Sequence, residues 1–129
     1  MKSVIIAIVI FALVIGCAFF ITFHFQSFTE KMLHKLDSLP NNMEDLEKTE
    51  EKELQEDVED IAALWDEEFQ RMVYIVGYSL VNRADSAINT MYTAVCTGNH
   101  EDYAINRREA MDALRRLQEL QGMRLSAVL

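Results

Sequence analysis

Histidine and cysteine are the residue types in this 129-residue chain best suited to nucleophilic or metal chemistry. His24 and His34 follow an apolar N-terminal segment, and His100 lies in a predicted turn. None of them falls in an H-E-x-x-H motif or has a second ligand at helical spacing, and Cys96 has no nearby Lys or Arg that would activate its thiol. A Gly-rich phosphate loop and a G-x-S-x-G motif are also missing. We therefore predict that the protein is not an enzyme and has no catalytic, cofactor-binding or metal-binding residues.

Carboxylates are concentrated in the second third of the chain, where they could bind cations. Ten Asp and Glu residues lie between Glu44 and Asp60, against only Lys48 and Lys52. A calcium-binding loop needs a Gly at its turn, and this run contains none. We interpret the run as the solvated face of a helix. The net charge of −9 disfavours nucleic acid as a partner and disfavours flat adsorption on anionic lipid.

Before these side chains lies a segment without charge, residues 4–23, with the sequence VIIAIVIFALVIGCAFFITF. As a helix, such a segment spans roughly 30 Å, the thickness of the hydrocarbon core of a bilayer, and it satisfies its own backbone polar groups. We predict a transmembrane anchor over residues 1–25, with the lipid bilayer as the partner of residues 4–23. The early Lys2 favours a single-pass cell-membrane protein with a cytoplasmic N-terminus and an extracytoplasmic helical domain.

Two alternatives to a spanning anchor stay open. A cleaved signal peptide has a shorter apolar core and an A-x-A site, which does not follow here. Residues 14–17 (VIGC) resemble a bacterial lipobox, in which the Cys is lipidated, but the residues after Cys17 remain apolar where a lipoprotein turns polar. In a membrane helix, Cys17 is simply a small apolar residue. A type IV pilin-like start is excluded because its cleavable Gly and early Glu are missing.

Helical periodicity continues beyond the anchor. An amphipathic extension and a Pro-containing turn are predicted for residues 26–40, because Pro40 cannot continue a helix. Apolar residues recur there at three- and four-residue steps, at Phe25, Phe28, Met32, Leu36 and Leu39. Residues 41–122 are predicted to form a small antiparallel helical bundle, and residues 123–129 a frayed C-terminal tail. The predicted fold class is therefore all-α.

The first helix of this bundle carries most of the acidic residues. We expect it to start with Asn41 as its cap and Glu44 three residues later, and to kink or break near Gly77. Its apolar stripe strengthens toward Trp65, the only tryptophan, which we interpret as a core anchor between helices. We expect the first half of the helix to be more exposed than the second. The stripe also offers more apolar edge than a bundle of this size can cover.

Two further helices complete the predicted bundle. The first covers residues 79–95, after which Gly98 suits the left-handed position and Asn99 the cap of the last helix. Gly122 is expected to end that helix. Basic residues gather on it, at Arg107, Arg108, Arg115 and Arg116. Antiparallel packing against the acidic helix would bring opposite charges together.

The layout of these segments is familiar: one anchor, an amphipathic continuation, a Glu-rich helix that reaches Leu64-Trp65, and two helices separated by a polar turn at residues 97–102. It resembles a domain-of-unknown-function family of small, membrane-anchored helical proteins of clostridial-type bacteria. The resemblance covers nearly the whole chain, with Trp65 as its sharpest landmark. Many relatives carry a His after that Trp, where this sequence has residues 76–78 (VGY). The resemblance implies a bacterial cell-membrane protein of helical fold, without an assigned activity or functional residues.

From these features we expect a membrane-anchored, non-enzymatic helical interaction or scaffold protein of the bacterial cell envelope. Its partner would be another envelope protein or a second copy of itself. The alternative is an extracytoplasmic ligand-binding or sensory domain, which binds a small molecule between its helices and acts through a partner protein. A division-type coiled coil fits less well, because Pro40 interrupts the apolar stripe that it would continue.

Overall fold

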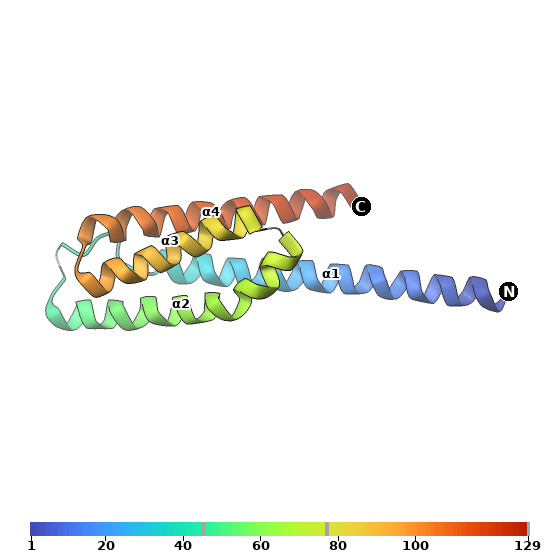
Figure 1. The fold of residues 1–129 in the computed structure, drawn as a ribbon, viewed down its shortest axis with the longest axis horizontal. Helices are drawn as coiled ribbons and strands as arrows, with labels where there is room; N and C mark the ends of the chain where they lie inside the picture. Colours follow the sequence, from blue (N-terminus) through green and yellow to red (C-terminus); the bar gives the residue numbers. More distant parts are fainter. Residues whose placement is uncertain (45, 77, 129) are drawn as a thin grey trace.

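Four helices make up the part of the chain that the computed structural model describes. The description covers the backbone of residues 1–44, 46–76 and 78–128, and the side chains in these ranges except those of residues 75, 76, 78, 80 and 121–128. The helices are α1 (Lys2–Asp37), α2 (Lys48–Val76), α3 (Tyr78–Thr97) and α4 (His100–Val128). They run alternately in opposite directions along one axis (Figure 1). The predicted all-α fold, a long apolar N-terminal helix followed by an antiparallel bundle, is confirmed.

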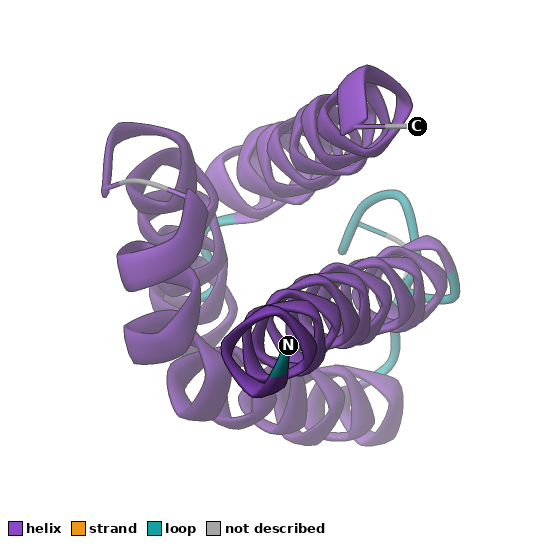
Figure 2. Ribbon diagram, turned by 90° about the vertical axis from the view of Figure 1, so that its right-hand side faces the viewer, coloured by secondary structure: helices purple, strands orange, loops and turns teal. Residues whose placement is uncertain are grey.

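Each helix contacts two others, so that the four form a ring when viewed from the end (Figure 2). α1 packs against α2 and α4, and α3 also packs against α2 and α4. Alternate helices, by contrast, run parallel on opposite sides of the ring, and no contact between α2 and α4 joins the described residues. The predicted charge pairing between the acidic second helix and the Arg-bearing last helix is therefore wrong. An ion pair instead joins neighbours, with Arg83 Nη2 on α3 lying 3.1 Å from Glu109 Oε2 on α4.

α1 is both a projecting apolar helix and a member of the bundle. Its first part extends beyond the other helices, and its last part packs among them (Figure 1). The buried residues of α1 lie on one face, at Phe25, Thr29, Met32 and Leu36. The buried Thr29 hydroxyl donates to the carbonyl oxygen of Phe25 at 2.7 Å, so its burial leaves no hydroxyl without a partner. The predicted amphipathic extension, which ends before Pro40, is confirmed.

The connection between α1 and α2 is longer than predicted. We expected the second helix to begin at Asn41 with Glu44 in its first turn, but α2 begins at Lys48. The side-chain oxygen of Asn42 accepts a hydrogen bond from the backbone N–H of Glu44 at 3.3 Å. Such local side-chain bonds compete with helix formation. Met43, only 2% exposed, gives the connection its own contact with the core.

The apolar stripe of α2 is buried along its whole length. It consists of Leu54, Val58, Ile61, Trp65 and Met72. The first half of α2 has more exposed residues than the described part of the second half, as expected, although its part of the stripe is buried. The bundle also covers the stripe, so it does not leave the excess apolar edge that the sequence suggested. The predicted break at Gly77 lies outside the described residues, although the helices on either side of it are antiparallel.

The turn between α3 and α4 follows the prediction. Gly98 has a φ of 73°, the left-handed geometry that suits glycine. The backbone N–H of Asn99 donates to Ala94 O at 2.9 Å, and that of Gly98 donates to Val95 O at 3.4 Å, which together form a Schellman motif. The side chain of Asn99 then caps α4 by accepting the N–H of Asp102 at 3.2 Å.

α4 differs from the prediction at its C-terminal end. The helix continues through Gly122 to Val128, so the predicted helix end at Gly122 is wrong. A glycine inside a helix costs only about 1 kcal/mol relative to alanine, and the residues around it are good helix formers. The buried stripe of α4 includes Tyr103, Ala110, Met111, Leu114 and Leu117, and Leu120 is partly buried.

Candidate functional site

The exposed part of α1 is the largest apolar surface in the described chain. Phe20 and Phe23 are 72% and 71% exposed, whereas Phe25, two residues later, is 2% exposed. Most of the large apolar side chains before Phe25 likewise point outward. By length and composition this is the one helix in the described residues that could cross a membrane. The transition near Phe25 therefore divides α1 into an uncovered apolar segment and a bundle segment.

Polar groups are sparse on this uncovered segment. The hydroxyl of Thr22 donates to the carbonyl oxygen of Ala18 at 2.9 Å, so it needs no partner outside its own helix. Such internal satisfaction is what hydrocarbon requires of a polar side chain. Cys17 lies in the middle of the segment and is exposed. The segment thus carries its polar atoms in a form compatible with lipid.

A charged cluster lies where the uncovered segment meets the bundle. His24 Nε2 on α1 lies 3.5 Å from Glu68 Oε2 on α2. Arg71 Nη1 approaches the other oxygen, Glu68 Oε1, at 3.3 Å. The Glu68 side chain is 14% exposed, and its Oε2 atom is buried without a hydrogen-bond partner among the described residues. A carboxylate oxygen in this state favours an additional hydrogen-bond donor.

Beside this cluster, α1 and α2 enclose a groove with a volume of about 300 Å³. α1 contributes His24, Ser27, Phe28 and Lys31 to its walls. α2 contributes Leu64, Glu67 and Glu68. The groove therefore combines apolar walls with charges of both signs.

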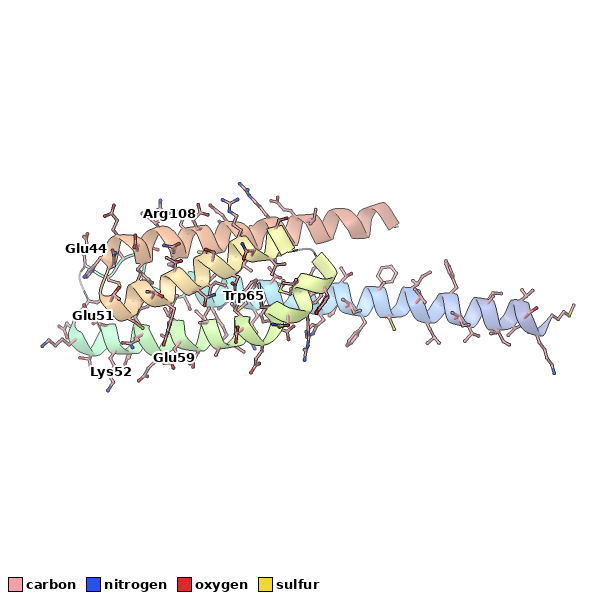
Figure 3. The ribbon with its side chains drawn as sticks, in the orientation of Figure 1. Glu44, Glu51, Lys52, Glu59, Trp65 and Arg108 are labelled. Carbon is pink, nitrogen blue, oxygen red and sulfur yellow. The ribbon has the colours of Figure 1, made fainter. Side chains whose placement is uncertain are left out.

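A network of hydrogen bonds joins α2 to α3 at Trp65, the residue after the groove residue Leu64. The indole N–H of Trp65 donates to Asp85 Oδ1 on α3 at 2.9 Å, and the side-chain amide of Asn89 donates to the same oxygen at 3.1 Å. Trp65 also stacks on Phe28 of α1, with ring centroids 6.4 Å apart. Figure 3 shows Trp65 in the interior of the bundle. The predicted role of Trp65 as a core anchor is confirmed, and its bond to Asp85 links α2 to α3.

At the opposite end of the bundle, α4 holds the C-terminus of α1. Arg107 is 8% exposed, and its Nε donates to Leu36 O at 3.0 Å while Nη2 donates to Asp37 O at 3.4 Å. Carbonyls at a helix C-terminus lack partners within their helix, and a cation there is favoured by the helix dipole. The hydroxyl of Tyr103 donates to Pro40 O at 2.6 Å. These bonds serve structure and lie far from the apolar segment.

The buried hydroxyl of Tyr103 should make the stability of the protein depend on pH in the alkaline range. Burial raises its pKa to about 12 from the ordinary 10.0, although Arg107 opposes the shift. The unfolded chain releases this proton at lower pH than the folded chain, so this contribution to stability is complete below pH 10 and is lost toward pH 12. We expect Tyr103→Phe to show a smaller drop in melting temperature than the wild type between about pH 9 and about pH 11. Tyr74→Phe, at an 87% exposed position, is the matched control, and an equal drop in all three proteins would contradict the assignment.

The remaining candidate side chains are dispersed. His34 is exposed on α1, and His100 is half-buried at the start of α4 with its Nδ1 buried and unpartnered. Cys96 is exposed near the end of α3, where its Sγ accepts a contact from Gln55 Nε2 at 3.7 Å. Within the described residues, no three His, Cys, Asp or Glu side chains are grouped so as to hold a metal ion.

The roles of three side chains were not predicted from the sequence. Arg107 had a detectable signal, since it lies four residues after Tyr103 and three before Ala110, on the buried stripe itself. Glu68 and Asp85 had none, because their partners lie on other helices. Comparisons with known proteins add no precedent for this arrangement, since no family model, no curated protein and no solved structure matches the chain.

Proposed function

We propose that the protein is a membrane-anchored, non-enzymatic interaction or scaffold protein of the bacterial cell envelope. One observation carries this proposal: a single helix, α1, is uncovered and apolar before Phe25 and buried in the bundle after it. Because α1 is one continuous helix, it connects the apolar segment rigidly to the bundle and holds the bundle beside the lipid surface in a defined orientation. The N-terminus is cytoplasmic and the bundle extracytoplasmic, in line with the early Lys2. The likeness to membrane-anchored clostridial-type proteins stays a prediction.

The outer surface of α2 favours a cationic partner. Its exposed acidic residues are Glu50, Glu53, Glu56, Asp57, Glu59, Asp60, Asp66 and Glu67. Figure 3 shows Glu59 and Lys52 on the side of α2 that faces away from the other helices. A surface with this much charge of one sign steers a partner of opposite sign and repels similar surfaces. The partner outside the membrane is therefore another envelope protein with clustered Lys or Arg, while a second copy would meet the chain through α1.

Carbodiimide crosslinking in native membranes tests this proposal, because the reagent joins carboxylates to partner lysines without a spacer. We expect the full chain to remain in the membrane pellet after an alkaline wash and to form a crosslinked species larger than the monomer. Neutralising the α2 surface with Glu56→Gln, Glu59→Gln and Asp60→Asn should reduce that species several-fold. The matched control neutralises three exposed carboxylates of α4, with Glu101→Gln, Asp112→Asn and Glu119→Gln.

Cys96 can report on which side of the membrane the bundle lies, since its thiol is exposed on the bundle. A membrane-impermeant maleimide should label it in intact cells and should not label the Cys96→Ser variant. Recovery of the chain in the soluble fraction would contradict the anchor, and monomer alone after crosslinking would contradict the partner. Equal loss of the crosslinked species in the α2 and α4 variants would contradict the assigned surface.

A second candidate function has one observation in its favour. The groove between α1 and α2 has a volume of about 300 Å³, at the lower end of the range for small-molecule sites. In this reading the bundle is a ligand-binding or sensory domain that acts through a partner protein. Binding would raise the melting temperature of the full chain in a screen of small molecules.

A further inference from the structure

The groove between α1 and α2 begins where the apolar segment of α1 ends. Its first wall residue, His24, directly follows the uncharged residues 4–23. If that segment fills the hydrocarbon core, the groove lies at the level of the lipid headgroups. The inference that follows rests on the membrane anchor of the proposed function.

Two of the charged side chains that line the groove form no ion pair with another described residue. Lys31 on α1 and Glu67 on α2 both line it, yet neither takes part in an ion pair with another described residue. Glu68 Oε2 is buried and has no hydrogen-bond partner among the described residues, although it lies 3.5 Å from His24 Nε2. The groove thus presents a free ammonium group near one wall and carboxylate oxygens on the other.

The walls between these charges are apolar. Phe28 and Leu64 are partly buried against the core and face the groove. A ligand that fits this arrangement has an anionic group for Lys31, a hydrogen-bonding cation for Glu68 and an apolar part adjoining the lipid. An anionic headgroup without an amine would leave Glu67 and Glu68 repelling its phosphate. A quaternary ammonium would leave Glu68 Oε2 without a donor.

We propose that this groove binds the headgroup of a zwitterionic phospholipid with a primary amine, a phosphoethanolamine. The phosphate lies against Lys31, with His24 beside it, and the ammonium group donates to Glu68 Oε2. The glycerol end leaves the groove along Phe28 toward the bilayer. The bound headgroup joins α1 to α2 at the base of the anchor and so sets the angle at which the bundle meets the membrane.

Native mass spectrometry of the full chain in mild detergent tests this assignment. The protein is incubated with equal amounts of phosphatidylethanolamine, phosphatidylcholine and phosphatidylglycerol that carry identical acyl chains. We expect about tenfold more ethanolamine lipid than choline lipid to remain bound, the ratio expected from one charge-assisted hydrogen bond. Glu68→Gln and Lys31→Gln should each abolish the preference. Glu59→Gln and Lys35→Gln, which alter exposed or outlying charges on the same two helices, should keep it.

Equal retention of the three lipids by the wild type would overturn the proposal, as would a preference that survives both Glu68→Gln and Lys31→Gln. Far-ultraviolet circular dichroism of each variant confirms that a lost preference does not reflect a lost fold. Glycerophosphoethanolamine distinguishes the two sources of this headgroup. If the soluble compound displaces the lipid at equal concentration, the groove binds a soluble ligand and the lipid assignment fails. The proposal of a membrane anchor is tested separately, because recovery of the chain in the soluble fraction would contradict it.

Discussion

Trp65→Ala is expected to destabilise the bundle by about 3–5 kcal/mol, the range for removing a buried tryptophan. Trp65 is 1% exposed, stacks on Phe28 of α1 and makes a tilted contact with Phe69 on its own helix, at centroid distances of 6.4 Å and 6.3 Å. Its removal leaves a cavity between three helices and deprives Asp85 of a hydrogen-bond donor. Urea unfolding of the full chain in micelles, followed by far-ultraviolet circular dichroism, measures the loss.

A second substitution at the same position separates packing from hydrogen bonding. Trp65→Phe keeps most of the apolar volume but loses the indole N–H that donates to Asp85 Oδ1 at 2.9 Å. We expect a smaller loss, about 1–3 kcal/mol, because the partly buried carboxylate of Asp85 loses one of its hydrogen-bond donors. A loss below about 1 kcal/mol for Trp65→Ala would show that the indole does not fill the core as described.

Arg107→Ala is expected to have the next largest effect, a loss of about 2–4 kcal/mol. The guanidinium donates to the last carbonyls of α1, Leu36 O at 3.0 Å and Asp37 O at 3.4 Å, from a position that is 8% exposed. Without it these carbonyls keep only part of their hydrogen bonding at a helix end that the bundle covers, and unsatisfied buried groups of this kind cost about 1–3 kcal/mol each. Urea unfolding measured under the same conditions checks the value.

The neighbouring arginine is the control for this prediction. Arg108 lies on the outer side of α4 (Figure 3) and is exposed, so Arg108→Ala should change stability by less than about 0.5 kcal/mol. Arg107→Lys should be nearly as harmful as Arg107→Ala, because a single ammonium group cannot reach both carbonyls with the geometry of a guanidinium. Similar losses for Arg107→Ala and Arg108→Ala would contradict the role of Arg107 as a helix cap.

Local pattern was sufficient to predict the features that depend on neighbours in the chain. The apolar segment, the stripe from Phe25 onward and the stop before Pro40 follow from residues within a few turns of one another. The turn at Gly98 and Asn99 was predictable for the same reason, since its hydrogen bonds join residues at most five apart. The start of α2 was missed because the Asn42 side chain competes locally with helix formation, and propensity does not resolve such competition.

The candidate site could be predicted only in part. The sequence indicated an anchor and a junction near residues 24–25, but it did not indicate which bundle residue would meet His24. Glu68 is one acidic residue among ten on α2, and only the packing of α2 beside α1 distinguishes it. The same holds for Asp85, one helix away from Trp65.

By itself the sequence determined that the chain is helical, that its first segment is apolar enough to cross a membrane, and that a stripe on each helix is buried. These properties follow from side-chain periodicity along one helix at a time. Only the tertiary structure decided that α2 and α4 lie diagonally and that Arg107 caps α1. The groove between His24 and Glu68 is likewise a product of packing. The physical reason is that the order of helices around the ring depends on how the apolar stripes of different helices pack together. The pattern of residues along any one helix does not specify this packing.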